Sequence, residues 1–277
     1  MVGHVEWLDF VEVDAIPAPG EIAEARGAWE EAAGGGAVAA VQLAKLAGTA
    51  TFYTALGADE HARRAEAQLV GQGIELAAAA RDVPQRRAVA FLDSHGERTI
   101  TVLGKRLVAI GRDDLPWEQL AEIDGVYFTG GDVEALRAAR AARSLVATPR
   151  ARDALEGSGV MLDALVRSGS DRREQDDPAA LGFSARIICT TRGPRGGTYV
   201  DSEGQSANFE AAPLEGPVVD AYGAGDSFAA GLTFGLGAGL PIAEAVSIAS
   251  RCGAGNLTGR GPYAGQPTAA DLGISPR

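Results

Sequence analysis

The residues best suited to chemistry lie in one short segment, Asp220-Ala221-Tyr222-Gly223-Ala224-Gly225-Asp226. Glycines at positions 223 and 225 allow a sharp turn that exposes successive backbone N–H groups, and the apolar run from Phe228 predicts a helix directly after them. Exposed amides at the positive end of a helix dipole bind anions. A carboxylate in the first turn, Asp226, can accept the proton of an attacking hydroxyl. The segment therefore predicts a phosphoryl-transfer site.

A plainer interpretation of the same segment is an ordinary loop in which Asp226 caps the following helix. Aspartate is well suited to the N-cap position, because its side chain accepts hydrogen bonds from the free N–H groups of the first turn. The four residues Gly223 to Asp226 alone favour this cap, and the surrounding sequence has to decide between the two interpretations.

Composition limits the classes of partner. The chain has 277 residues with a formal net charge of −12, which argues against general affinity for nucleic acid or an anionic membrane. The only two cysteines, Cys189 and Cys252, have no thiol or histidine at metal-ligand spacing, and we expect a reducing cytoplasmic location. Glu6 precedes any apolar run, so no signal peptide is predicted. The stretch from Phe228 to Ala249 contains glycines and Pro241, which favours two packed helices over a membrane span.

The elements that must position these residues alternate between strand and helix. Such alternation predicts a doubly wound α/β domain with a mostly parallel sheet, without repeats or linkers. A small β appendage is expected from the first strand and a hairpin that turns at 94–97. Strands are predicted at 2–13, 49–54, 87–92, 98–103, 125–129, 144–147 and 186–191, a further hairpin at 198–210, and helices at 37–47, after Gly57, at 132–143 and from 228 onward.

The extended segment from Asp220 to Gly231 resembles the C-terminal signature of the ribokinase-like, or PfkB, family of carbohydrate and nucleoside kinases. That signature is Asp-Thr-x-Gly-Ala-Gly-Asp followed by Ser/Ala-Phe-x-Ala-Gly, and only Ala221, at the threonine position, departs from it. The resemblance implies that Asp226 is the catalytic base and that Gly223, Ala224 and Gly225 form the anion hole.

Other stretches follow the family's order along nearly the whole chain. Pro17 to Glu21 and Gly34-Gly35-Gly36 resemble the substrate region, which implies that Gly35 and Gly36 approach the acceptor. The loop from Thr191 to Gly196 and the stretch from Asn256 to Gly261 resemble the nucleotide-binding segments. The implied nucleotide contacts are Thr191, Gly193, Gly196, Asn256 and Gly261, and Asp220 is implied at a monovalent-cation site.

Two regions depart from the family pattern. In place of the Asn-x-x-Glu motif that organises water around magnesium, the chain has Asp171-Arg172-Arg173-Glu174, where Asp171 and Glu174 are candidate water-mediated ligands. A solvated helix start with internal ion pairs is the alternative.

On the acceptor side, Ala39 stands where ribokinases have a sugar-binding asparagine, and Leu8 stands where they have an aspartate. Asp9 is one place away, and Glu6 falls at another polar contact. Glu6 and Asp9 are therefore the candidate acceptor ligands, and the acceptor itself is left open. Arg26, Arg87 and Arg98 lie near the appendage, where each is either an anion contact or a solvated surface residue.

The resemblance implies a single ribokinase-like domain over 1–277. Its fold would be a three-layer α/β/α sandwich, with a small β lid formed from about 10–26 and 86–103. It also implies a kinase that uses ATP with Mg²⁺, and possibly K⁺, to phosphorylate a sugar or related alcohol, and that pairs with a second copy through the lid. A nucleoside or vitamin kinase of the same fold and a degenerate sugar- or nucleotide-binding sensor are the alternatives. A dinucleotide-dependent oxidoreductase is not favoured, because no Gly-x-Gly-x-x-Gly turn follows the first strand.

Overall fold

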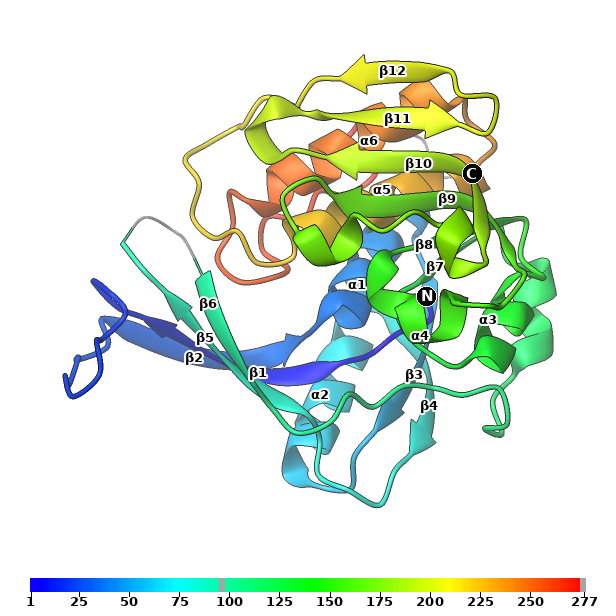
Figure 1. Cartoon of the computed structure of the whole chain (residues 1–277). Helices are drawn as coiled ribbons and strands as arrows, with labels where there is room; N and C mark the ends of the chain where they lie inside the picture. Colours follow the sequence, from blue (N-terminus) through cyan, green and yellow to red (C-terminus); the bar gives the residue numbers. More distant parts are fainter. Residues whose placement is uncertain (95–97, 275–277) are drawn as a thin grey trace.

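The computed structural model describes residues 1–94 and 98–274, and a large central sheet forms its body (Figure 1). Six of its strands follow the order β12, β11, β10, β9, β8, β7, with parallel pairing from β7 to β10 and antiparallel pairing beyond. Val2 pairs in parallel with both Phe128 and Tyr53, so β3 and β4 continue the sheet on the far side of β7. The strand bounds are β3 Ala50–Leu56, β4 Ile74–Ala80, β7 Gly125–Phe128, β8 Ser144–Ala147, β9 Met161–Ser168, β10 Ser184–Thr191, β11 Gly197–Asp201 and β12 Ser206–Phe209.

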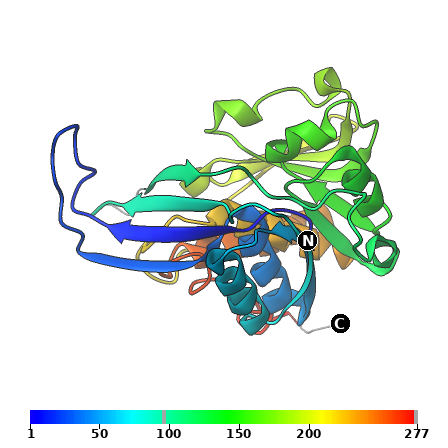
Figure 2. The same ribbon diagram turned by 90° about the horizontal axis from the view of Figure 1, so that it is seen from below.

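Helices cover both faces of this sheet, which gives three layers (Figure 2). Alternating side chains of β7 show the division: Tyr127 belongs to the core shared with α1, α5 and α6, whereas Val126 and Phe128 belong to the core shared with α3 and α4. The predicted α/β/α sandwich with a mostly parallel sheet is confirmed. The helix bounds are α1 Gly35–Ala47, α2 Glu60–Gly71, α3 Val133–Ala139, α4 Arg152–Leu155, α5 Ala224–Gly237 and α6 Ile242–Asn256.

A second sheet projects from the body (Figure 1) and has the order β2, β1, β5, β6. Its strands are β1 Glu6–Glu12, β2 Gly27–Ala33, β5 Arg87–Leu92 and β6 Arg98–Leu103. The bounds of β5 and β6 are those predicted, although residues 95–97 of the expected turn lie outside the described residues. Only part of the predicted segment 10–26 is strand, because β1 ends at Glu12. The edge strand β2 was not predicted, since Gly-Ala-Trp-Glu-Glu-Ala-Ala contains no β-branched residue.

The two faces of this second sheet differ in what they contact. Phe10 packs edge-on against Tyr222, just before α5, with ring centroids 5.3 Å apart. Trp7, on the opposite face, packs against Arg64 of α2, whose guanidinium carbon lies 4.3 Å from the ring centroid. We call the face with Phe10 the inner face and the face with Trp7 the outer face.

The apolar C-terminal helices are separate, as predicted, with α5 ending at Gly237 and α6 beginning at Ile242. Across the part of the chain that the structure describes, none of the helices is both long enough and apolar enough to cross a bilayer.

Candidate active site

The carboxyl ends of the parallel strands bring several loops to one edge of the central sheet, the usual position of a ligand site in such folds. Thr129 follows β7, Arg150 follows β8, Glu174 lies in a turn after β9, and Thr191 ends β10. Helix α5 packs against β7 and β8 and begins at this edge. Loops that are far apart in the sequence therefore surround the start of α5.

The start of α5 has the form of an anion hole. Gly223 is the N-cap with a φ of 85°, and no side chain caps the first turn, so the first N–H groups have no helical acceptor. A Cβ at Gly223 would lie 2.8 Å from Val38 Cγ1, so both conformation and space require glycine there. Asp226 lies inside the first turn and not at the N-cap. The helix-cap interpretation of Asp226 is therefore wrong.

The Asp226 carboxylate is partly buried between the starts of α5 and α1. A Cβ at Gly35 would lie 2.6 Å from Asp226 Oδ1, so the absence of a side chain at Gly35 allows this approach. Burial raises the pKa of Asp226 from 3.8 to about 6, while the guanidinium groups of Arg150 and Arg98 act in the opposite direction. The carboxylate is thus placed and poised for proton exchange near neutral pH.

Tyr222 connects the anion hole to the glycine turn and the second sheet. Its hydroxyl oxygen accepts a hydrogen bond of 2.9 Å from the Gly34 N–H. Arg98, from β6, donates to the carbonyl oxygen of Ala221 and lies 5.7 Å from the Tyr222 ring centroid. The sequence analysis gave Tyr222 no role, because its partners come from segments far away in the chain.

Asp220 joins the two loops behind the anion hole. Its carboxylate oxygens accept hydrogen bonds from the N–H groups of Tyr222, at 2.8 Å, and Gly261, at 3.1 Å. Burial raises its pKa. The buried Asn256 donates to the Pro262 carbonyl at 2.8 Å and so holds the same loop. Asp220, Asn256 and Gly261 are thus brought together as a support, and the monovalent-cation role of Asp220 stays a prediction.

The predicted magnesium contacts lie near the site but are bound to Arg150. Its guanidinium lies 2.9 Å from Glu174 Oε1 and 3.2 Å from Asp171 Oδ2, and the other Glu174 oxygen accepts the Ser168 N–H at 2.7 Å. Among residues 1–94 and 98–274, no group of three or more His, Cys, Asp or Glu side chains could hold a metal ion. The carboxylates therefore do not fit a magnesium ligand pair, because a guanidinium is already paired with both. The alternative of a solvated segment with internal ion pairs is not matched either, since Glu174 is buried and the ion pairs are with Arg150, outside the segment.

The loop after β10 is folded against the chain segment that follows β12. Gly193 and Gly196 have φ values of 57° and 67°, and a Cβ at Gly196 would lie 2.0 Å from the Phe209 carbonyl oxygen. Thr191 Oγ1 donates to the Arg167 carbonyl at 3.4 Å. Phe209 in turn stacks on Phe228 of α5, with centroids 5.7 Å apart. The predicted nucleotide loop is therefore tied to the helix of the anion hole.

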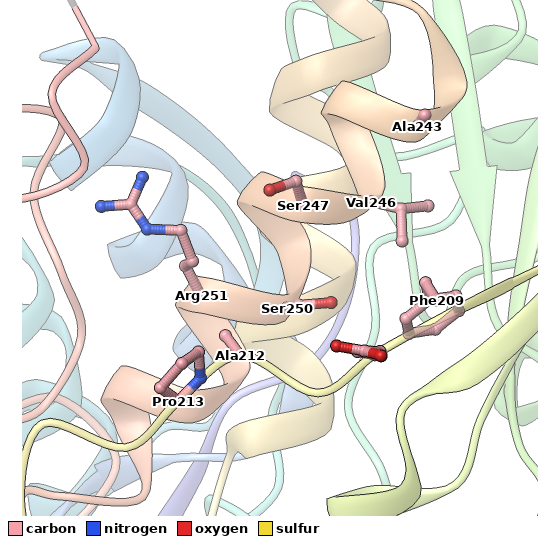
Figure 3. A pocket seen from close by; sticks show the side chains of 9 residues that line it. Phe209, Ala212, Pro213, Ala243, Val246, Ser247, Ser250 and Arg251 are labelled. Atoms are coloured by element: carbon pink, nitrogen blue, oxygen red, sulfur yellow. The ribbon is translucent and has the colours of Figure 1, made fainter.

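A cleft of about 280 Å³ lies beside Phe209 (Figure 3). Ser250 presents a buried hydroxyl without a hydrogen-bond partner among the described residues. One turn further along α6, a Cβ at Gly253 would lie 3.2 Å from the Ala224 carbonyl oxygen, so this part of α6 packs against the first turn of α5. The segment after β12 and helix α6 form its two walls, lined by Phe209, Glu210, Ala212, Pro213, Ala243, Val246, Ser247, Ser250 and Arg251.

The acceptor side of the site is built around Glu6. Glu6 Oε1 lies 3.0 Å from His4 Nε2 and 3.0 Å from Arg86 Nε, and these neighbours hold the pKa of the buried carboxylate below its usual range. A Cβ at Gly34 would lie 3.2 Å from Glu6 Cγ. Gly35 follows Gly34 and contacts Asp226. Glu6 and Asp226 therefore border the same space.

Other predicted acceptor residues have different positions. Gly36 packs on the backbone of His4, where a Cβ would lie 2.5 Å from the carbonyl oxygen. Asp9 is on the outer face, where its carboxylate binds Arg87 at 2.7 Å, so the structure does not bring it to Asp226. Arg26 pairs with Asp14 in the loop after β1. Of the three arginines considered from the sequence, only Arg98 reaches the site.

Together, fold and site define an α/β protein with an uncapped helix N-terminus next to a partly buried carboxylate. The model for the pfkB family of carbohydrate kinases matches residues 1–167 and 162–269, and the chain belongs to this family. A search of curated proteins found no match.

Solved structures share the fold over almost the whole chain. Ribokinase from Thermotoga maritima is 19% identical with a TM-score of 0.76, covering 98% of this chain and 96% of its own. Arabidopsis thaliana ribokinase, solved with ribose and ATP, is 20% identical with a TM-score of 0.77 and the same coverage. A Methanocaldococcus jannaschii nucleoside kinase is 16% identical with a TM-score of 0.71, covering 98% of this chain and 95% of its own.

Proposed function

We propose that the protein transfers the γ-phosphoryl group of ATP to a hydroxyl of a sugar or sugar-like molecule. The observation that supports this best is the position of Asp226, in the first turn of an uncapped helix and against the start of a second helix at Gly35. One carboxylate and a set of free N–H groups then face the same point. This is the arrangement that hydroxyl activation and charge stabilisation require together.

In the proposed reaction, Asp226 accepts the proton of the acceptor hydroxyl as its oxygen forms a bond to the γ-phosphorus. The bond between that phosphorus and the oxygen bridging to the β-phosphate breaks, and ADP leaves. The N–H groups at Gly223 to Gly225 stabilise the negative charge that develops on the phosphoryl oxygens. A pKa of about 6 leaves Asp226 mostly ionised at neutral pH, and therefore able to take the proton.

For the ATP base, we propose the cleft between Phe209 and α6. Its wall of Phe209, Pro213 and Val246 suits a flat aromatic ring, and the unpartnered Ser250 hydroxyl can bond a ring nitrogen. The cleft adjoins the first turn of α5, so a nucleotide bound there directs its phosphates toward the anion hole. The A. thaliana ribokinase solved with ATP, on the same fold, supports a nucleotide in this family of structures.

The test is an ADP-release assay over sugars, polyols, nucleosides, vitamins and their acidic derivatives, with Asp226→Asn beside the unmodified protein. We expect turnover of a true acceptor to fall by about 10²- to 10⁴-fold in the variant, because it loses the general base. ATP binding measured by calorimetry should persist, since the N–H groups are unchanged. Unchanged turnover would refute the mechanism, and a protein that binds but never turns over ATP would be a sensor.

A further inference from the structure

Beside Glu6 lies a half-buried cation, Arg106, in the loop after β6. Its guanidinium lies over Gly130 at the sheet edge, where a Cβ would lie 3.7 Å from Arg106 Nη1. That nitrogen donates to the Arg150 carbonyl oxygen at 3.1 Å. Among the ion pairs of the described residues, Arg106 takes part in none. It is therefore a positive charge next to the acceptor space with no carboxylate bound to it.

Arg86 adds a second guanidinium next to Glu6. Its Nε lies 3.0 Å from Glu6 Oε1 but makes no hydrogen bond, and its side chain is only 15% exposed. Glu6 Oε1 is shared with His4, whose Nε2 lies 3.0 Å from it. The desolvated Arg106 also lies close enough to the positive charges of Arg86 and Arg150 for both to lower its pKa. These donors and charges favour an anion.

The guanidinium groups near this space differ in what they bind. Arg86 pairs with Glu6, and Arg150 pairs with Asp171 and Glu174. Arg98, on the inner face, binds a backbone carbonyl oxygen, and so does Arg106. Among the described residues, Arg98 and Arg106 are therefore the guanidinium groups at this site that have no carboxylate bound to them.

Two of the positions that would hold a neutral sugar provide no polar group. Leu8 and Ala39 stand where the family resemblance places an aspartate and an asparagine, and both are fully buried. Sugar hydroxyls buried against these side chains would lose hydrogen bonds to water without replacement. The polar contacts available to an acceptor next to Asp226 are predominantly arginine donors.

We propose that the acceptor is a hydroxylated organic anion, a sugar acid or sugar phosphate, whose charged group is bound by Arg106 and Arg86 while its hydroxyl lies at Asp226. This inference rests on the proposed kinase function. Guanidinium groups bind carboxylate and phosphate through paired N–H donors, so either anion meets the same chemistry. Glu6 holds Arg86 in place and acts as a positioning residue.

The experiment compares acceptors that differ in charge. Each sugar is supplied as the neutral sugar, as its aldonate, and as a phosphate ester that leaves the primary hydroxyl free, and kcat/KM is measured by ADP release. We expect one anionic form to exceed the neutral sugar by at least about 100-fold, and the aldonate and ester arms identify which anion is used. A higher kcat/KM for the neutral sugars would overturn the inference.

Variants of Arg106 then test its role. Arg106→Ala should lower kcat/KM for the anion by about 10- to 100-fold, mainly through KM, without changing the KM for ATP. Arg106→Lys should recover part of the loss because it keeps the charge. Lys105→Ala is the matched control, since it removes a neighbouring exposed cation. Equal behaviour of Arg106→Ala and Lys105→Ala would contradict the proposal, and thermal unfolding of each variant verifies that it is folded.

Binding to Asp226→Asn separates this inference from the proposed function. Calorimetry should show that the aldonate or the phosphate ester binds this variant and that Arg106→Ala, added to it, weakens the binding. If turnover does not depend on Asp226, the kinase mechanism fails while the binding result still stands. If neutral sugars are phosphorylated with dependence on Asp226 and anions do not bind, the kinase stands and the anionic acceptor is wrong.

Discussion

The two sides of the active site are built in different ways. On the donor side, the start of α5 works through its backbone: Gly223 sets the turn, and N–H groups face the phosphoryl position. On the acceptor side, the side chains of Glu6, Arg86, Arg98 and Arg106 come from separate parts of the chain. A function carried by backbone geometry needs a short contiguous segment, whereas one carried by side chains can change one residue at a time. The donor side therefore retains its motif while the acceptor side departs from it.

The largest effect on the donor side is expected from Gly35→Ala. The added Cβ would lie 2.6 Å from Asp226 Oδ1 and must displace the carboxylate, so kcat should fall by about 100-fold with little change in ATP binding. Steady-state kinetics with a true acceptor measures it. Gly71→Ala in α2, where nothing lies within 4 Å of the added carbon, is the matched control. A Gly35→Ala enzyme with normal kcat would show that the two helix starts need not approach so closely.

A second prediction concerns the free-energy cost of keeping Asp226 ionised in the folded protein. Its pKa is about 6 in the folded protein against 3.8 in the unfolded chain, so between these values the folded state binds more protons and the free energy of unfolding falls as pH rises. At about 1.36 kcal/mol per pKa unit, this shift lowers the free energy of unfolding at neutral pH by at most about 3 kcal/mol.

Asp226→Asn removes this penalty and should raise the free energy of unfolding at about pH 7.5 by about 1–3 kcal/mol. The gain should vanish at about pH 3 and below, where the carboxyl is largely protonated in both states. Urea unfolding at the two pH values measures the difference. A variant that is less stable than the unmodified protein at neutral pH would show that the carboxylate supports the fold.

The contrast between the two sides also explains what sequence reasoning achieved. The start of α5, the hairpin strands β5 and β6 and the parallel strand β8 were predictable, because each depends on neighbouring residues: a glycine turn, alternating residues or a short apolar run. Strand β2 was missed because pairing with β1, and not its own composition, makes it a strand.

The side chains that complete the site were harder to predict. Arg106 and Arg150 lie in polar loops that resemble solvent-exposed segments in the sequence, and only the ends of β6 and β8 bring them to Glu6 and Asp226. Asp171 and Glu174 were candidate magnesium contacts from the sequence, but both pair with Arg150, which follows the neighbouring strand β8. Spacing along the chain cannot show such a partner.

A third prediction separates the glycines of the anion hole. Gly223→Ala should lower the free energy of unfolding by about 2 kcal/mol, because alanine is strained at a φ of 85° and would contact Val38. Gly225→Ala should change stability by less than about 1 kcal/mol, since it has open space and an ordinary helical backbone. Urea unfolding of both variants measures the difference. Equal losses would mean that the turn tolerates a side chain at Gly223.

The smallest expected effect is that of substituting Arg150, and it appears only at acidic pH. The ionised form of Asp226 should make kcat/KM rise with pH through about 6 and level off above it. Arg150 favours that ionised form, so Arg150→Gln should raise the apparent pKa and reduce activity near pH 6 by less than about tenfold, with recovery in alkaline buffer. Releasing Asp171 and Glu174 from Arg150 adds negative charge and acts in the same direction.

The matched control for Arg150→Gln is Arg152→Gln, because Arg152 pairs with Glu156 and Asp176 and not with the carboxylates of the site. Its pH profile should match that of the unmodified protein. If the loss in Arg150→Gln persists at every pH, Arg150 contacts the transferring phosphoryl group and does more than tune the base. That result would make Arg150 a contact of the phosphoryl group on the donor side of the site. Its guanidinium would then supply a full positive charge, which the backbone amides do not.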